Sequence, residues 1–500
     1  MRKIFKHIKN IDARFLKKLD VFSIVNLGLF VYQILYLFYS YKYINKVVPI
    51  WYSGAWGLDQ LAPKNTLFLI PLTSFLIFIS GFLINILMKK YNLRYSSNII
   101  TLVVLVSNIF LTKSVLRIVE ISSVLVVSPF NPTYFQLLKP FLISAIFTML
   151  IAPFFIKFAF SKNIVTNPLA HAHPGMVLAK PSTRGGGVIF TTVFVIVSLF
   201  YVRLSYQTIG ILIGTILLAA IGFVDDIQNT NIYSKLKFLE VPLLRLFLLF
   251  LIVGVVTLFG VRIESIGIPF DGVLNFTRIK IPFGGLQVIP LASLITVIWV
   301  VWILNLLSWS NGVDGQYSGI IGITGIVIAL LSLRFSPLQP YQENIARMAV
   351  ILAGASFGLI PYTWHPSKIM WGFGAMSAGM VLAGLSVLST SKIATSVIVL
   401  MIPFLDGLVT LVRRILQGKN PLKGDKGHLH HLLLERGWSP KQIALFYWFT
   451  TAVFGMIGIL ASDKYLVQIT LTLGGVVAFF IILLNLKSKS VKQLLSRSEK

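Results

Sequence analysis

Long runs of apolar residues recur along the whole chain, separated by shorter polar stretches. The runs are continuous and do not alternate with period two, and each is close to the about 20 residues that a helix needs to cross a bilayer. Because a spanning segment must satisfy its own backbone hydrogen bonds, the pattern predicts an all-α polytopic membrane protein with about 14 transmembrane helices. The runs lie near 21–41, 66–88, 99–119, 137–159, 186–205, 207–224, 240–260, 289–308, 317–333, 345–363, 371–390, 393–412, 443–461 and 465–486.

The charges of the chain favour one orientation in the membrane. Lys and Arg number 44 against 16 Asp and Glu, which gives a formal net charge of +28. In a soluble protein this would suggest nucleic acid, but here the basic residues flank apolar runs, as the positive-inside rule describes. We therefore expect cytoplasmic N- and C-termini, a retained first span, a lipid bilayer as partner and no nucleic acid. The absence of cysteine excludes disulfides and thiolate metal sites.

The polar residues gather in four islands, all in the second part of the chain. With the predicted orientation, every island falls on the cytoplasmic side. We expect a three-helix membrane region of unknown role at 1–135 and an eleven-helix core domain at 136–500. The stretch 262–288 predicts a short external hairpin. The islands are 171–187, 225–237, 305–316 and 413–437.

The second island begins with two adjacent carboxylates, Asp225 and Asp226, at the inner end of an apolar run. Ionisable residues in such a place are costly and usually functional. A divalent cation or a positioned base would explain the pair, and so would an ordinary solvated helix end.

The third island carries polar residues at a spacing of three: Asn305, Ser308, Asn311 and Asp314. Residues at this spacing share one face of a helix or of its continuation. They could line a ligand site, or they could form a polar helix end followed by a glycine turn.

The first island combines Lys180 and Arg184 with three glycines, Gly185–Gly187, just before an apolar run. Basic side chains and free backbone N–H groups beside a helix start suit phosphate. An ordinary positive flank of a membrane helix is the alternative.

The fourth island holds His428, His430 and His431 among several lysines and arginines. Imidazoles could bind metal, move protons or contact phosphate, and the basic surroundings favour phosphate or nucleotide. Just before the island, Asp406 could pair with Arg413 or Arg414 and have a structural role. Together, the islands fit phosphoryl transfer at a membrane surface.

The islands resemble, in order, the motifs of the polyprenyl-phosphate N-acetylhexosamine-1-phosphate transferases. This family includes the phospho-N-acetylmuramoyl-pentapeptide translocase and the initiators of teichoic acid and O-antigen (lipopolysaccharide) synthesis. STRGGGVIF is similar to its PxxRxGG segment, GFVDDI with SKLK to its DD motif and basic helix, and NLLSWSNGVDG to NxxNxxDGxDG. The most specific match is PFLDG…RR…GKNPLKGDKGHLHH to PxxD…R…GxSPxxxDxxHxHH.

The resemblance implies transfer of a sugar-1-phosphate from a UDP-sugar to undecaprenyl phosphate, with release of UMP, at the cytoplasmic face of a bacterial inner membrane. It implies Mg²⁺, or alternatively Mn²⁺, as cofactor, and it leaves a homodimer open. Asp225, Asp226 and Asp314 would be catalytic residues that also hold the metal. The resemblance further assigns catalytic roles to His428, His430 and His431, and substrate binding to Lys180, Arg184, Lys235, Asn305, Asn311, Arg413, Arg414 and Asp425.

Two acidic positions of the family pattern are changed, and the second Asn of NxxNxxDGxDG is Ser308 here. The first Asp of NxxNxxDGxDG is Asn311 here, and Phe373 in PSKIMWGFGAMS stands where the family's PAKxFMGDxGS has an Asp that helps to hold Mg²⁺. These departures favour a second hypothesis, a homologue that binds nucleotide-sugar or lipid phosphate without turnover. A transporter, the third reading, would place its charges at mid-span, whereas these acids lie at inner helix ends.

Overall fold

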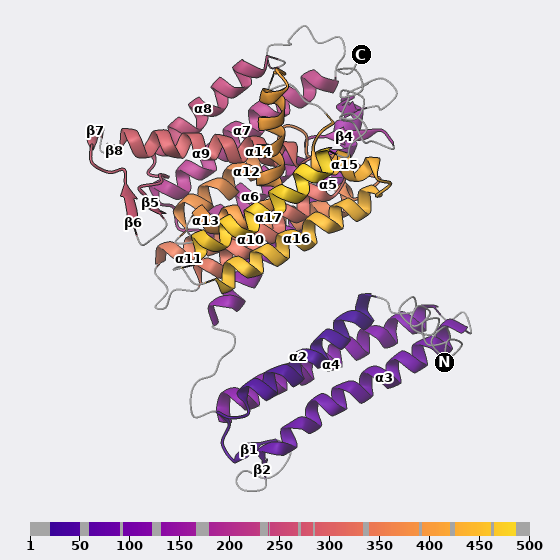
Figure 1. Cartoon of the computed structure of the whole chain (residues 1–500). Helices are drawn as coiled ribbons and strands as arrows, with labels where there is room; N and C mark the ends of the chain where they lie inside the picture. Colours follow the sequence, from indigo (N-terminus) through magenta and orange to yellow (C-terminus); the bar gives the residue numbers. More distant parts are fainter. Residues whose placement is uncertain are drawn as a thin grey trace. The chain divides into compact units, whose positions relative to one another are not determined.

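Helices make up most of the computed structural model (Figure 1). The prediction of an all-α membrane protein is confirmed, and the described strands form only small two- and three-stranded sheets, none of them closed. The structure describes residues 21–50, 60–90, 94–122, 132–166, 180–230, 239, 241–268, 272–283, 286–333, 340–389, 393–420, 426–461 and 465–486.

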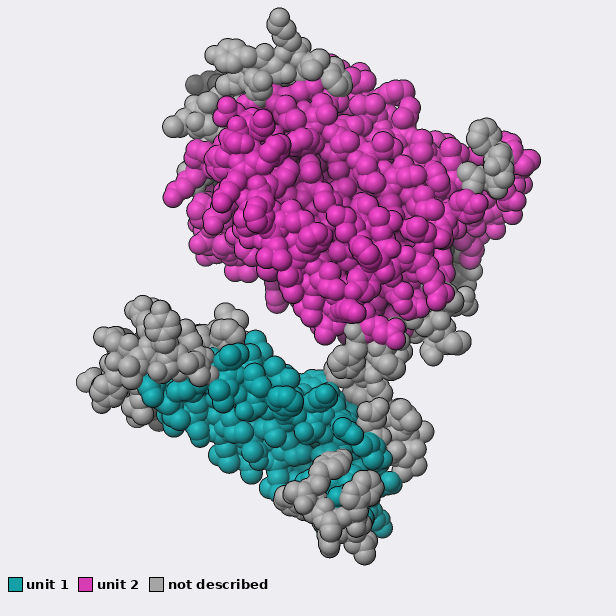
Figure 2. Space-filling view, turned by 180° about the vertical axis from the view of Figure 1, so that it is seen from behind, with its two compact units in different colours: residues 1–131 teal, residues 132–500 magenta. Residues whose placement is uncertain are grey.

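The chain divides into two compact units, Met1–Asn131 and Pro132–Lys500 (Figure 2). The boundary expected from the sequence, between residues 135 and 136, falls in the first turn of helix α5 (Pro132–Ser161). Unit 1 contains α2 (Val21–Ser40), β1 (Val47–Pro49), β2 (Leu61–Pro63), the 3-10 helix η2 (Lys64–Phe68), α3 (Leu69–Lys90) and α4 (Arg94–Ser122).

Hydrogen bonds between buried polar side chains join the three long helices of unit 1. Asn108 on α4 donates to Asn26 on α2 and accepts from Ser74 on α3, both at 2.8 Å. Gln33 on α2 donates to Ser74 at 3.2 Å and to Thr112 at 2.8 Å. Apolar contacts alone hold helices together weakly in lipid, so these bonds explain how three apolar helices keep one arrangement.

Unit 2 is built around α12 (Ala375–Leu388), which is buried along most of its length. Around it, α7 packs against α12, α11 packs against both α5 and α10, and α10 packs against α16. The further helices of unit 2 are α6 (Gly186–Tyr201), α7 (Tyr206–Thr230), α8 (Pro242–Leu258), α9 (Pro290–Trp309), α10 (Gln316–Ser332), α11 (Pro340–Thr363), α12 (Ala375–Leu388), α13 (Ile393–Val399), α14 (Met401–Leu416), α15 (Leu429–Glu435), α16 (Pro440–Leu460) and α17 (Leu466–Leu486).

Each of the fourteen apolar runs contains helix, but fourteen separate crossings are not confirmed. Among the described residues, 8 helices are long and apolar enough to cross a membrane, or up to 9 if one bent pair counts as a span. Five further apolar helices are shorter, at 10–17 residues. The run at 393–412 is the bent pair: α13 and α14 meet at 87°. Pro403, four residues after Val399, has no N–H to donate to the Val399 carbonyl, which explains the break.

Small strands shape two ends of unit 2. The stretch expected as one external hairpin forms two, in which β5 (Ser265–Ile268) pairs with β6 (Gly272–Asn275) and β7 (Ile281–Phe283) with β8 (Leu286–Val288). At the other end, β4 (Ser182–Arg184) pairs antiparallel with β3 (Val165–Thr166) and parallel with β9 (Ile369–Met370). This second sheet fixes the first polar island against the segment between α11 and α12.

Candidate active site

Residues 364–374, between α11 and α12, form a loop at which three of the polar islands meet. Its strand β9 pairs with β4 of the first island. The Phe373 N–H donates to Asp226 Oδ1 of the second island at 3.0 Å. The Asn311 side-chain amide of the third island donates to the Gly372 carbonyl at 3.4 Å. The 364–374 loop therefore joins chain segments that are far apart in the sequence.

Close backbone packing at this loop requires glycine. Gly372 has φ +64°, and a Cβ there would lie 2.0 Å from Asp226 Oδ2. A Cβ on Gly187 would lie 2.2 Å from the Gly374 carbonyl oxygen. The Gly187 N–H donates to the Trp371 carbonyl at 3.3 Å, so it serves this packing and is not directed at a phosphate. A side chain at either glycine would push the loop away from the acids.

The two adjacent carboxylates near the end of α7 are buried, and each faces an arginine. Arg245 Nη2, from the first turn of α8, lies 2.6 Å from Asp225 Oδ1. Asn229 donates to the other oxygen of Asp225 at 2.7 Å. Arg184 Nη1 lies 3.5 Å from Asp226 Oδ1. A buried carboxylate is stable only with such partners, so the pair depends on two arginines from different elements.

Asp314, between α9 and α10, faces the 364–374 loop. Its Oδ2 lies 2.7 Å from His365 Nδ1 and accepts the Ser367 N–H at 3.2 Å. Sequence reasoning missed His365, because a single histidine between Trp364 and Pro366 matches no motif. The structure shows that the loop orients the Asp314 carboxylate as well as Asp226.

The histidines of the fourth island lie at the start of α15 and are positioned by Asp406 on α14. Asp406 Oδ2 lies 3.1 Å from His428 Nδ1, and its Oδ1 accepts the Leu429 N–H at 2.7 Å. The suggestion that Asp406 pairs with Arg413 or Arg414 is therefore wrong among the described residues. Asp406 lies two helical turns before them on α14, about 10 Å along the axis, and its carboxylate accepts the first N–H of the next helix instead.

His430 connects the fourth island with the third. Its ring lies 4.2 Å from that of His431 and is stacked at 5.7 Å on that of His428, measured between centroids. A Cβ on Gly312 would lie only 2.2 Å from His430 Nε2. Burial, and then the neighbouring His431 and His428, hold the pKa of His430 well below the usual 6.5. The ring is therefore neutral near pH 7.

A sequence model of the family described as "Glycosyl transferase family 4" matches residues 208–390, which include the acidic pair, the third island and the 364–374 loop. This part of the chain is similar to glycosyl transferase family 4.

Named relatives agree with this family. The chain is 31% identical over 161 residues to the decaprenyl-phosphate N-acetylglucosaminephosphotransferase of Mycolicibacterium smegmatis. This alignment covers 28% of this chain and 40% of the relative. It is 24% identical over 337 residues to the probable undecaprenyl-phosphate N-acetylglucosaminyl 1-phosphate transferase of Bacillus subtilis, covering 66% and 86%. It is 23% identical over 331 residues to the phospho-N-acetylmuramoyl-pentapeptide-transferase of Wolbachia, covering 63% and 95%. The alignments with the decaprenyl-phosphate enzymes thus span two fifths or less of their length.

The remaining residues that the family motifs select have varied surroundings. Lys180 is exposed, and the Asn305 amide donates to Val301 of its own helix at 2.8 Å. Arg414 is buried, and its Nη2 lies 3.4 Å from His428 Nε2. Arg413 lies against Gly427, where a Cβ would meet its guanidinium. Lys235 and Asp425 lie outside the described residues.

The carboxylates of this site do not fit a three-carboxylate magnesium centre. Among the described residues, no three His, Asp or Glu side chains come together as metal ligands. Asp225 is paired with Arg245, Asp226 with Arg184 and the Phe373 N–H, and Asp314 with His365. Asp226 Oδ2 is buried without a hydrogen-bond partner in the described part of the chain, but magnesium needs several oxygen ligands in near-octahedral geometry, and the three acids face separate protein partners. The assignment of Mg²⁺ to the three acids stays a prediction.

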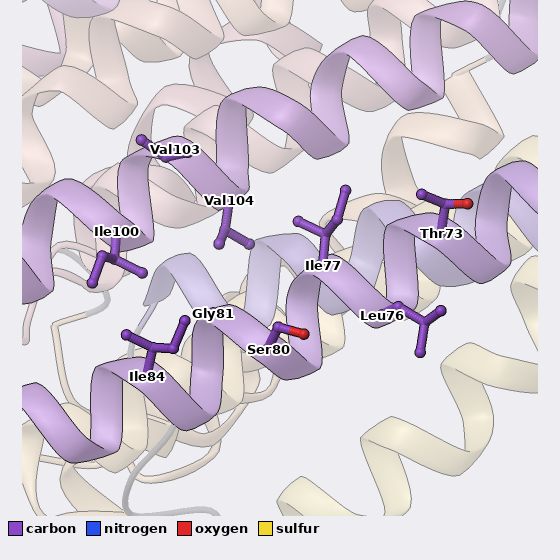
Figure 3. A pocket seen from close by; sticks show the side chains of 9 residues that line it. All are labelled: Thr73, Leu76, Ile77, Ser80, Gly81, Ile84, Ile100, Val103 and Val104. Atoms are coloured by element: carbon purple, nitrogen blue, oxygen red, sulfur yellow. The ribbon is translucent and has the colours of Figure 1, made fainter.

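Two cavities lie away from these residues. One, of about 410 Å³, lies between α3 and α4 in unit 1 and has Thr73 and Ser80 as the polar side chains in its lining (Figure 3). The other, of about 390 Å³, is lined by Gln207, Gly260 and Ser386 among others, at the ends of α7, α8 and α12 opposite to the acidic pair. Neither contains a polar island, so the convergent site is the candidate for chemistry.

Proposed function

We propose that the protein transfers N-acetylhexosamine-1-phosphate from a UDP-sugar to undecaprenyl phosphate, and releases UMP, at the cytoplasmic face of a bacterial inner membrane. The observation that carries the proposal is the convergence of all four polar islands at one end of an apolar helical unit. Relatives named for transfer to decaprenyl and undecaprenyl phosphate support it. The product would enter cell-envelope glycan synthesis.

The reaction would be an in-line phosphoryl transfer. An oxygen of the lipid phosphate attacks the phosphorus attached to the sugar, and a new P–O bond forms. The bond between that phosphorus and the bridging oxygen breaks, and the bridging oxygen leaves with UMP. Such reactions depend mainly on positioning and on neutralising phosphate charge.

The side chains present can supply both requirements. A guanidinium has five N–H donors, so Arg184 and Arg245 can keep their carboxylates and still bind phosphate oxygens. The neutral His430 can donate or accept one hydrogen bond without adding charge. Asp406 fixes the ring of His428, which places a further donor near the substrate. No step is assigned to a metal ion.

A second candidate is a homologue that binds the nucleotide-sugar or the lipid phosphate without turnover. The Asn311 amide, bonded to the Gly372 carbonyl, favours it because an amide brings no negative charge to the acidic centre. Binding through Arg184, Arg245 and the histidines would remain in such a protein.

The deciding experiment measures UMP release by the purified full chain in detergent. It supplies undecaprenyl phosphate and a panel of UDP-N-acetylhexosamines, with Mg²⁺, Mn²⁺ or EDTA. We expect lipid-dependent UMP from one or more sugars, at rates of about 1 per second or more. Arg347→Gln, far from the site, is the control and should behave as the wild type. If a known family 4 transferase is active alongside and this protein releases no UMP, the binder replaces the enzyme.

A further inference from the structure

The Arg245 guanidinium contacts a carboxylate and a backbone carbonyl. Its Nη2 lies 2.6 Å from Asp225 Oδ1, and its Nε donates to the Leu239 carbonyl. The Asp225 side chain is only 4% exposed, whereas that of Arg245 is 29% exposed. A carboxylate buried so far requires a neutralising partner, and among the described residues Arg245 supplies a cation beside it.

Phe373 contacts both carboxylates of the pair, one directly and one through Arg245. The guanidinium carbon of Arg245 lies 5.1 Å from the centroid of the Phe373 ring, within the range of a cation–π contact. The backbone N–H of Phe373 donates to Asp226 at 3.0 Å. The positive φ of Gly372 and its close approach to Asp226 keep the loop in this place. One loop position thus sets the surroundings of both acids.

We propose that Arg245 is the resident cation at Asp225 and that Phe373 is its positioning residue. In this arrangement a guanidinium neutralises Asp225, where the first hypothesis from the sequence placed a metal ion. A divalent cation bound to the same carboxylate would lie within a few ångströms of the guanidinium, and the two charges would repel each other strongly at a buried site. The pair should therefore bind divalent cations weakly while Arg245 and Phe373 are present.

The first test measures binding of Mn²⁺ alone to the purified full chain in detergent, by electron paramagnetic resonance of the free ion. The wild type should bind Mn²⁺ only weakly. The double variant Arg245→Gln, Phe373→Asp should bind at least tenfold more tightly, because it removes a cation and adds a carboxylate. Adding Asp225→Asn to the double variant should abolish the gain. Wild-type binding that depends on Asp225 and equals that of the double variant would overturn the proposal.

Matched variants separate positioning from a general structural effect. Arg347→Gln also removes an arginine that forms an ion pair with a carboxylate, that of Glu343. The Arg347 side chain is 24% exposed, similar to that of Arg245. This variant should leave Mn²⁺ binding unchanged. Phe373→Trp keeps an aromatic face and should keep binding weak, whereas Phe373→Leu should strengthen it. Equal Mn²⁺ affinity in the tryptophan and leucine variants would contradict the positioning role. Arg245→Lys keeps a positive charge beside Asp225 and should keep Mn²⁺ binding weak. If Arg245→Gln fails to fold, Arg245→Met removes the charge with another unbranched side chain.

A second test rests on the proposed function and compares its metal requirement. UMP release by the wild type should persist in EDTA, while any release by the double variant should require Mg²⁺. If the wild type releases no UMP, the proposed function fails, but the Mn²⁺ measurement still decides the role of Arg245. If the wild type is active and loses more than tenfold of its rate in EDTA, the resident-cation proposal fails and the proposed function stands.

Discussion

The Asp406 carboxylate contacts the His428 ring and also accepts a hydrogen bond from the first N–H of helix α15. One carboxylate oxygen lies 3.1 Å from His428 Nδ1, and the other accepts the Leu429 N–H at 2.7 Å. The carboxylate thus fixes the ring plane and satisfies an N–H at the start of α15. This arrangement links the bend between α13 and α14 to the site, because the bend sets the direction of the helix that carries Asp406.

Replacing Asp406 should therefore affect both activity and stability. Asp406→Ala leaves the buried Leu429 N–H without its acceptor and takes the carboxylate away from His428 Nδ1; an unsatisfied buried group costs about 1–3 kcal/mol. We expect a 10- to 100-fold loss in UMP release and a lower thermal midpoint. Asp406→Asn, which can still accept one hydrogen bond, should lose less of both. Glu435→Gln, which changes an exposed carboxylate at the end of α15, is the control. Full activity of Asp406→Ala would remove the orienting role.

The contact of Gly312 with His430 predicts that alanine is not tolerated there. The new Cβ would lie 2.2 Å from His430 Nε2, so the ring must move. Overpacking of this kind typically costs about 1–3 kcal/mol. We expect Gly312→Ala to lower the thermal midpoint and to reduce UMP release by about tenfold or more. Gly475→Ala, where a Cβ meets nothing within 4 Å, should change neither. Similar results for the two alanine variants would refute the close packing.

The neutral state of His430 makes a definite prediction for the dependence of stability on pH. Its pKa in the folded protein lies well below the 6.5 of the unfolded chain. Below pH 6.5 the unfolded state therefore takes up a proton that the folded state does not, and stability falls as the pH decreases. The slope from one such group is at most about 1.4 kcal/mol per pH unit. It should disappear in His430→Gln, measured as unfolding midpoints between pH 7.5 and 5.5. An identical pH slope in this variant would show that His430 is not the group.

The sequence predicts helices and islands well because both follow from local composition. Apolar length alone places a helix in every run, and an acidic pair at the end of α7 stands out because charge is costly there. The bend between α13 and α14 was not predicted, since a single proline such as Pro403 barely changes the mean hydropathy of an apolar run. Arg245 resembles any basic residue flanking a membrane helix, and nothing near it in the sequence indicates Asp225 as its partner. Its role depends on packing of α7, α8 and the 364–374 loop, which is tertiary information.

His365 offers a last prediction, on a residue that no motif selected. Its Nδ1 lies 2.7 Å from Asp314 Oδ2, and the Ser367 N–H donates to the same oxygen at 3.2 Å. His365→Ala removes one of these partners and leaves the other, so Asp314 should keep its place but lose its fixed orientation. We expect UMP release to fall by about tenfold, mainly in kcat, because orienting groups act on the transition state. His365→Asn, whose amide can still donate to Asp314, should recover part of the rate. An unchanged kcat in His365→Ala would mean either that the Ser367 N–H alone orients Asp314 or that Asp314 does not act in the transfer. Asp314→Asn separates the two: it should be inactive if the Ser367 N–H orients a working Asp314, and active if Asp314 has no role.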